Sequence, residues 1–296
     1  MPSPFKPMLL SPAKTPPAGP GWVHEPKLDG WRLIVDVTAG RVRAWSRTGK
    51  EWTAAVPELE VLAGLGDAAL DGELVAVTAD GRADFGLLTA RMNGGPACPV
   101  TFYAFDLLRC AGQDLAGRPW TERRDRLDRL DLAVRSAGTA RPTVWEPDGA
   151  VMHQATADTG LEGTVSKQAR SAYRPGRSSA WVKAKHRVTA TFEVAGWKPP
   201  TGSRPGGLIL AEGGEPVGVA PLGLPRAERV GLLALAGRYG RRHPSGTVTL
   251  PGGCLEAVVR FSSRTPTHRL LREPSVVAVR PATGPPAHQA APHPDL

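Results

Sequence analysis

The chain contains 296 residues, of which 41% are hydrophobic, and it carries a formal net charge of +9. This length and composition exclude an intrinsically disordered chain and leave room for two modest domains, each with its own core. Lys and Arg outnumber Asp and Glu by 37 to 28, which favours a polyanionic partner, and duplex nucleic acid is the commonest one.

The cysteines and the hydropathy of the chain indicate where the protein works. Its three cysteines include no C-x-x-C pair, and an odd number argues against a disulfide framework. No apolar run is long enough to span a bilayer, and the N-terminal segment lacks the h-region and cleavage site of a signal peptide. We therefore expect a monomeric cytoplasmic protein, associated with the nucleoid, that has no membrane partner.

A first domain is predicted over residues 21–187, after a Pro-rich N-terminal arm at residues 1–20. Apolar residues alternate with polar ones around a Thr-Ala-Gly turn, which predicts a β-hairpin at residues 31–46. Apolar periodicity and enrichment in branched and aromatic residues then predict further short elements. In chain order these are a short helix after Pro57, a strand at 69–77, a short helix at 84–92, a strand at 100–108, an amphipathic helix at 118–134, and strands at 163–168 and 181–187.

A second domain is predicted over residues 188–283. Its first strand, at 191–198, runs into a loop rich in Pro, Gly and Ser. Short strands and one inserted helix follow, a pattern that fits a small Greek-key barrel of the OB type. The strands are expected at 207–213, 216–222, 247–251, 254–263 and 275–281, the helix at 226–240, and a disordered Pro/Ala/His-rich tail at 284–296.

The most informative segment is Glu-Pro-Lys-Leu-Asp-Gly-Trp-Arg at residues 25–32. Lys27 follows a strand, with a carboxylate two residues later and a glycine that permits a tight turn. Alone, a Lys-x-Asp-Gly tetrapeptide is more often a surface turn with a solvated lysine. Five further segments in a fixed order change that interpretation, namely S-R-T-G at 46–49, D-G-E at 71–73, F-D at 105–106, E-G at 162–163 and K-A-K at 183–185.

Together these six segments resemble the nucleotidyltransferase motifs of ATP-dependent DNA ligases, which are related to those of RNA ligases and mRNA capping enzymes. The resemblance implies an α+β fold, with a catalytic adenylation domain of ATP-grasp-like antiparallel sheets and helices followed by a C-terminal OB-fold β-barrel. It also implies that the enzyme seals nicks in double-stranded DNA, in DNA repair, with ATP and Mg²⁺ (or Mn²⁺) as cofactors.

The resemblance makes Lys27 the nucleophile that attacks the α-phosphate of ATP, so its amine must be uncharged at that moment. Lys183 and Lys185 alternate along a strand and share a face, where they are expected to hold the α-phosphate and favour the neutral amine. Glu162 is the expected metal carboxylate, and Asp29 is expected to position the site. The lysine then passes its AMP to a 5′-phosphate at a nick, and the adjacent 3′-hydroxyl displaces the AMP.

The other predicted residues bind the rest of the nucleotide. Glu25 is expected to hold adenine and Phe105 to stack on it. Arg32 and Arg47 are expected to contact the ribose and phosphate side, and Glu73 to bind the ribose hydroxyls or a metal. Each has an ordinary structural interpretation, because an isolated Phe in an apolar strand is more often core and Arg is mostly a surface residue. Their place in the ordered set of motifs favours the functional one.

The second domain is expected to contact DNA phosphates through basic residues, which include Lys198, Arg204 and Arg280. Its C-terminal motif departs from the family. Arg280 matches the arginine of a basic Arg-x-Asp-Lys-type motif that orients pyrophosphate, but the Pro-Ala-Thr at 281–283 replaces the residues that should follow. We therefore expect either slow self-adenylation, use of another basic residue such as Arg272, or dependence on a partner.

Two alternatives remain open at this point. An RNA ligase or a capping guanylyltransferase shares the lysine chemistry, although the segments at 181–186 and 193–207 look more like those of DNA ligases. A non-catalytic DNA-binding relative of a ligase is supported only by the altered C-terminal motif. The chain otherwise resembles the minimal two-domain form of bacterial repair ligases, whose partners include end-joining or repair proteins.

Overall fold

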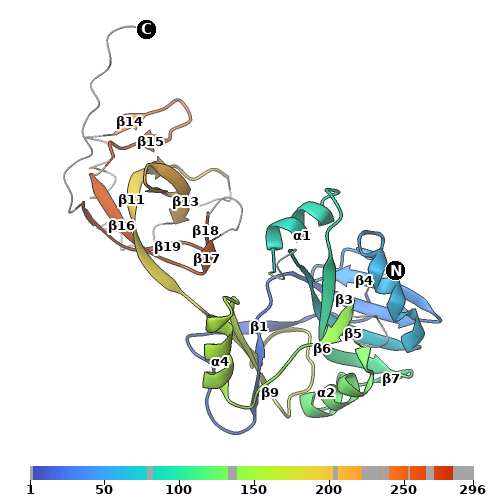
Figure 1. Cartoon of the computed structure of the whole chain (residues 1–296). Helices are drawn as coiled ribbons and strands as arrows, with labels where there is room; N and C mark the ends of the chain where they lie inside the picture. Colours follow the sequence, from blue (N-terminus) through green and yellow to red (C-terminus); the bar gives the residue numbers. More distant parts are fainter. Residues whose placement is uncertain are drawn as a thin grey trace. The chain divides into compact units, whose positions relative to one another are not determined.

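The computed structural model describes residues 3–78, 83–132, 139–202, 206–221, 234, 240–252, 254–264 and 270–282. The chain forms two compact units, Met1–His186 and Arg187–Leu296 (Figure 1). Most of the helix predicted at 226–240, and the tail predicted at 284–296, lie outside the described residues. Among the described residues, no helix is long and apolar enough to cross a membrane.

The first unit contains two β-sheets and several short helices. Its strands are β1 (Met8–Ala13), β2 (Trp22–Pro26), β3 (Trp31–Thr38), β4 (Arg41–Ser46), β5 (Ala68–Ala76), β6 (Val100–Cys110), β7 (Gln113–Asp114), β8 (Ala140–Pro142), β9 (Gly163–Gln168) and β10 (Gly176–Lys185). Its helices are η1 (Thr53–Ala55), η2 (Pro57–Leu65), α1 (Phe85–Met92), α2 (Trp120–Arg129) and α4 (Gly149–Asp158). The smaller sheet has the strand order β1-β10-β9-β2, and the larger has β4-β3-β5-β6-β7 with β8 paired to β6.

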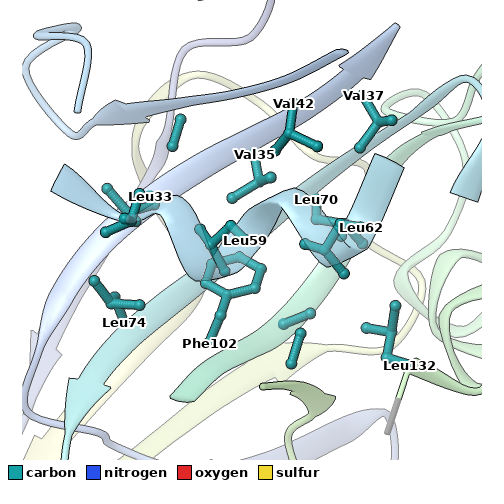
Figure 2. Packing of buried hydrophobic residues seen from close by; sticks show 14 of the residues in the cluster. Leu33, Val35, Val37, Val42, Leu59, Leu62, Leu70, Leu74, Phe102 and Leu132 are labelled. Atoms are coloured by element: carbon teal, nitrogen blue, oxygen red, sulfur yellow. The ribbon is translucent and has the colours of Figure 1, made fainter. Parts of the chain in front are cut away.

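The core of the larger sheet lies beneath η2. Leu59 and Leu62 of this helix are buried against Leu33, Val35 and the rest of an apolar cluster (Figure 2). The helix begins at Pro57, where a proline costs no intrahelical hydrogen bond. The short helix predicted here is confirmed in position and takes the tighter 3₁₀ form.

The N-terminal segment differs from the arm expected at residues 1–20. Residues 8–13 form β1, which pairs parallel to β10 in the smaller sheet. Met8 is fully buried, and its backbone N–H donates to the hydroxyl oxygen of Tyr173 at 3.0 Å. This strand escaped prediction because its partner lies more than 160 residues away and no hairpin signal accompanies it.

A second apolar cluster contains residues of both sheets. Met8, Val23 and Trp181 come from the smaller sheet, and Ile34 and Leu108 from the larger one. Trp120 of α2 packs into the same cluster. The two sheets are therefore held against one another, and the space at the end of this cluster can be lined by both.

The described part of the second unit forms a curled antiparallel sheet and a separate two-stranded sheet. Its strands are β11 (Val188–Lys198), β12 (Gly207–Glu212), β13 (Glu215–Pro221), β14 (Arg241–Arg242), β15 (Val248–Thr249), β16 (Leu255–Phe261), β17 (Ser263–Arg264), β18 (Leu271–Arg272) and β19 (Ser275–Pro281). The long β11 pairs with β16 along its first half and with β12 and β15 along its second half, which lets the sheet curl around its core (Figure 1). Phe192, Leu210 and Val259 are buried in that core.

Candidate active site

The register of the smaller sheet aligns the predicted residues in cross-strand rows. β9 lies between β2 and β10, so Val165 has Glu25 on one side and Lys183 on the other. Two residues earlier in β9, Gly163 lies opposite Lys185, and its carbonyl accepts the N–H of Lys27 at 2.8 Å. Because paired residues, and residues two apart in a strand, share a face, both rows present their side chains on the same side of the sheet.

Two glycines allow the chain to approach this closely. A Cβ on Gly163 would lie 2.2 Å from the carbonyl oxygen of Ala184, and the backbone of Gly163 has a φ of +151°. A Cβ on Gly30 would lie 2.1 Å from the carbonyl oxygen of Leu74 in β5. The glycines of the E-G and K-x-D-G motifs are therefore required by backbone packing around the lysine.

The larger sheet provides the opposite wall. Arg32 of β3 and Glu73 of β5 are directly paired. A register shift between Asp71 and Gly72 leaves Phe105 as an extra residue in β6, opposite neither of them. Such a bulge re-aims a side chain, and here it brings Phe105 to the space between the sheets.

These two walls enclose a cavity of about 290 Å³. Seven of the predicted residues line it, namely Glu25, Lys27, Arg32, Arg47, Glu73, Phe105 and Lys183. The remaining two of unit 1, Glu162 and Lys185, are linked to the cavity through Lys27. One contiguous site therefore contains these nine candidates of the first domain, and Asp29, the expected positioning residue, is close enough to act on the charge of Glu73.

At one end of the cavity, Glu162 joins the two lysines of different motifs. Its Oε2 accepts from the ammonium of Lys27, and its Oε1 lies 2.6 Å from Nζ of Lys185. Burial acts to raise the pKa of Glu162, but the two ammonium groups outweigh it and hold that pKa below its ordinary value. The carboxyl of Glu162 therefore stays ionised at neutral pH beside these two lysines.

The carboxyl of Glu73 has a different environment. Burial raises its pKa to about 7, although the charges of Lys27 and Arg32 oppose the shift. The guanidinium of Arg32 donates to Asp71 Oδ1 at 2.9 Å and to the carbonyl of Met8 at 2.6 Å. Most of the donors of Arg32 therefore fix its place between the sheets, while its side chain still lines the cavity.

The structure adds a residue that the sequence analysis missed. Lys167 lines the cavity with only 1% of its side chain exposed, and its Nζ lies 2.6 Å from Glu25 Oε2. Its signal in the sequence is the strand period, since Lys167 is two residues beyond Val165 and shares its face. Trp181 of β10 also lines the cavity.

The predicted DNA-binding residues lie apart from this cavity in the chain. Lys198 is an exposed residue at the end of β11, and Arg280 lies in β19 of the second unit. The Nε of Arg280 donates to Glu256 Oε2 at 3.3 Å, and its side chain is 53% exposed. Arg204 lies outside the described residues.

Comparison with known proteins identifies the family. The model of the ATP-dependent DNA ligase domain matches residues 7–185, more than half of the chain. The chain belongs to this family. The fold class expected from the sequence is therefore confirmed, with a nucleotidyltransferase fold in the first unit and a curled antiparallel sheet of the OB type in the second. The predicted enzyme class, an ATP-dependent DNA ligase, is that of the family.

Similar proteins include DNA repair ligases. The multifunctional non-homologous end joining protein LigD of Pseudomonas aeruginosa is 38% identical over 216 residues, which are 71% of this chain and 26% of that protein. A probable DNA ligase of Streptomyces griseus is 38% identical over 207 residues, 64% of this chain and 40% of that protein. The structure of a mycobacterial DNA ligase D complexed with ATP and MES has a TM-score of 0.58 at 29% identity and covers 93% of this chain and 95% of that one. This ligase chain spans about a quarter of the length of the end-joining relatives.

Proposed function

We propose that this chain joins nicks in double-stranded DNA through a covalent Lys27–AMP intermediate formed from ATP. Membership of the DNA ligase family supports this proposal. The observation that carries it is the convergence of Lys27, Glu162 and Lys185 at the rim of a cavity that also holds Phe105 and Glu73. Similarity to end-joining proteins favours a role in DNA repair, with end-joining or repair proteins as partners.

The phosphate end of the cavity suits the first step. Lys27 loses its ammonium proton, its Nζ forms a bond to the α-phosphorus, and the bond from that phosphorus to the bridging oxygen of pyrophosphate breaks. Lys183, which lines the cavity, and Lys185 supply positive charge to the phosphate as charge develops on it. Glu162 holds the ammonium groups of Lys27 and Lys185 in place until ATP arrives.

The other residues hold the nucleoside. Phe105 offers an aromatic face for adenine. Glu25 lies in β2, two residues before Lys27, and lines the same cavity. Glu73 suits the ribose hydroxyls, and Arg47, in the turn after β4, is an exposed cation at the cavity. Arg32 is held in the cavity wall by its hydrogen bond to Asp71, and from this fixed position it is proposed to contact the ribose and phosphate side of ATP.

The carboxylates fit a magnesium or manganese ion that is carried in with ATP. Among the described residues, no group of three or more His, Cys, Asp and Glu side chains could hold a metal ion alone. Mg²⁺ typically uses one or two carboxylates together with substrate phosphates, and Glu162 and Glu73, both close enough to Lys27 to interact with its charge, provide that number. The bound metal would neutralise charge on the phosphates.

DNA binding is proposed to rest on non-specific phosphate contacts. The net charge of +9 and the exposed Lys198 and Arg280 support this view. Such contacts release counterions, so sealing at subsaturating DNA is expected to fall by about 10-fold or more between roughly 50 and 200 mM salt. A rate of nick sealing that is flat over this range would contradict the proposed phosphate contacts.

The altered C-terminal motif is proposed to affect the self-adenylation of Lys27 and not the final sealing of the nick. Arg280 pairs with Glu256, and Pro281 and Ala282 follow it. Self-adenylation is therefore proposed to be slow compared with sealing of a nick that is already adenylated. Single-turnover rates of the two reactions, measured on the same preparation, compare them directly.

The decisive test is labelling with ATP that carries a radioactive α-phosphate, followed by a nick-sealing assay on DNA and on RNA duplexes. Lys27→Ala is expected to lower adduct formation by at least about 1,000-fold while DNA binding stays within about 2-fold. Lys14→Ala, which removes an exposed lysine away from the cavity lining, is the matched control and should label normally. A Lys27→Ala protein that still forms the adduct would remove Lys27 from the mechanism.

A further inference from the structure

The first unit has a second hollow on its larger sheet, beside the hairpin of β3 and β4, with a volume of about 520 Å³. None of the residues that line it lines the cavity with Lys27. Its lining includes three arginines, one carboxylate and one tryptophan, namely Arg41, Arg43, Arg109, Asp36 and Trp45. This β4 hollow is therefore a separate place at which the chain presents positive charge.

The alternation of side chains along β4 creates the hollow. Val42 and Ala44 belong to the apolar cluster beneath η2. Because successive side chains of a strand point to opposite faces, Arg41, Arg43 and Trp45 take the other face of the sheet. Trp45 is only 2% exposed, whereas Arg41 is exposed and Arg43 half-buried. The two guanidinium groups thus stand beside a packed indole on a regular strand.

The register of the sheet predicts an ion pair that the structure does not contain. Asp36 of β3 lies directly opposite Arg43, a position in which opposite charges attract. Arg109 takes this carboxylate instead, by reaching across the small side chain of Ala69 in the strand between them. It donates to Asp36 Oδ1 at 2.6 Å, and the hydroxyl of Thr38 donates to Oδ2 at 3.0 Å. Asp36 is therefore satisfied without Arg43.

The charge that remains in the β4 hollow is that of Arg41 and Arg43. The Nε of Arg109 also donates to Asp67 Oδ1 at 2.5 Å, so two carboxylates balance Arg109. Among the described residues, neither Arg41 nor Arg43 forms an ion pair. Residues two apart in a strand lie about 7 Å from one another, so their like charges repel and an anion beside both is stabilised. The planar fork of an arginine matches phosphate oxygens in particular.

We propose that the β4 hollow is a second phosphate-binding site, which takes the backbone of duplex DNA away from the nick through Arg41 and Arg43. This inference rests on the proposed function, because it adds a contact to the same substrate. Strand β3 links the two sites, since Arg32 lines the cavity with Lys27 and Thr38, further along the strand, lines the hollow. At about 3.3 Å per residue they lie about 20 Å apart, which is the length of about 6 base pairs.

The test measures binding of a nicked duplex that lacks the 3′-hydroxyl at the nick, by fluorescence anisotropy between about 50 and 200 mM salt. Arg41→Gln/Arg43→Gln removes two phosphate contacts, so the slope of log K against log salt should decrease by about 2 and the affinity by about 10-fold. Arg41→Lys/Arg43→Lys keeps both charges and should keep the slope.

The position of the contact is tested with duplexes of two lengths, closed by hairpin loops. Arms of about 12 base pairs on each side of the nick reach beyond the proposed contact, and arms of about 4 base pairs do not. The loss caused by Arg41→Gln/Arg43→Gln is expected on the long duplex only.

The matched control is Arg118→Gln/Arg129→Gln. Both arginines are exposed residues of the same unit that line neither hollow nor cavity, so the change in net charge is the same. This variant should keep the affinity and the slope of the wild type on both duplexes.

Three results would overturn the inference while the proposed function stands: wild-type binding by Arg41→Gln/Arg43→Gln, an equal loss in the control variant, or an equal loss on the short duplex. The unfolding temperature shows whether each variant is folded. If Arg41→Gln/Arg43→Gln does not fold, Arg43→Gln alone decides, with an expected decrease of about 1 in the slope. If the wild type neither binds nicked DNA nor forms an adduct with ATP, the proposed function fails together with the inference.

Discussion

The cavity has two ends that are built from the same pair of residue types in different environments. At one end, Lys27, Glu162 and Lys185 form a cluster whose side chains are 17%, 9% and 13% exposed. At the other end, Lys167 and Glu25 form a pair that is 1% and 3% exposed. The first cluster is the more exposed of the two, whereas Lys167 of the second lies against two aromatic rings and donates to a backbone carbonyl.

The electrostatic consequences are opposite at the two ends. At the accessible end the ammonium groups win over burial, and the pKa of Glu162 is lowered. At the buried end burial wins, so the pKa of Glu25 is raised and that of Lys167 is lowered. The comparison teaches that the depth of burial, and not the residue types, decides whether an ion pair keeps the pKa of its carboxylate low.

The largest effect expected from this comparison is on stability. Lys167→Met leaves a buried carboxylate without its main partner and should lower the free energy of unfolding by about 3–5 kcal/mol. Lys185→Met leaves Glu162 paired with Lys27, so it should cost less, about 1–2 kcal/mol. Urea denaturation of both variants measures the difference, and equal losses would show that burial does not distinguish the two ends.

A smaller expected effect concerns catalysis at the accessible end. Glu162→Gln keeps the shape of the side chain but cannot balance two ammonium groups, so adduct formation should fall by about 100-fold. Its thermal unfolding temperature should stay close to that of the wild type. The control is Glu60→Gln, on the exposed face of η2, which should change neither quantity. Normal labelling by Glu162→Gln would separate this carboxylate from the chemistry.

The smallest expected effect is a pH dependence behind the same sheet. His24 of β2 is buried, and its Nδ1 bonds to the hydroxyl of Ser166 at 2.8 Å. Burial lowers the pKa of His24, although Asp148 and Glu146 oppose the shift. The folded state therefore favours the neutral ring, and stability present above the ordinary pKa of about 6.5 is lost as the pH falls through that value.

The measurement is the unfolding temperature at about pH 7.5 and about pH 5.5. The decrease on acidification should be smaller by about 2–4 °C in His24→Asn than in the wild type. The matched control is His243→Asn, an exposed histidine of the second unit, which should show the wild-type decrease. An identical decrease in all three proteins would contradict the assigned role of His24.

Most of the candidate site could be predicted from the sequence because its residues lie in short ordered motifs. Glu73 and Glu162 each lie beside a glycine, and Lys27 lies two residues before an Asp-Gly pair, so the motifs are recognisable; the structure brings the three residues to one site. Lys167 could not be singled out in this way, because a lysine in a strand is ordinarily a solvated residue. Its burial depends on Trp181 and Phe105, which come from two other strands.

The elements of the fold also divide into those that local sequence patterns predict and those that they do not. Local patterns were enough for the hairpin of β3 and β4, the helix after Pro57 and the longer strands of the second unit, but not for its short strands β14 and β18. They were not enough for β1, which pairs with a strand at the far end of the unit, or for α4. The capping carboxylate of α4, Asp148, is a local signal that was missed, since it accepts from the N–H groups of Ala150 and Val151.

By itself the sequence was enough to indicate the family of this protein, and its ordered motifs named Lys27 and its companion cations and carboxylates as the candidate site. Those properties follow from residue identity and spacing, which the chain carries wherever it folds. Only the tertiary structure decided which carboxylates stay charged and which lysine is buried, because burial and charge separation arise when strands distant in sequence pack together. The pairing of Lys167 with Glu25 is therefore a property of the two packed sheets and not of either motif.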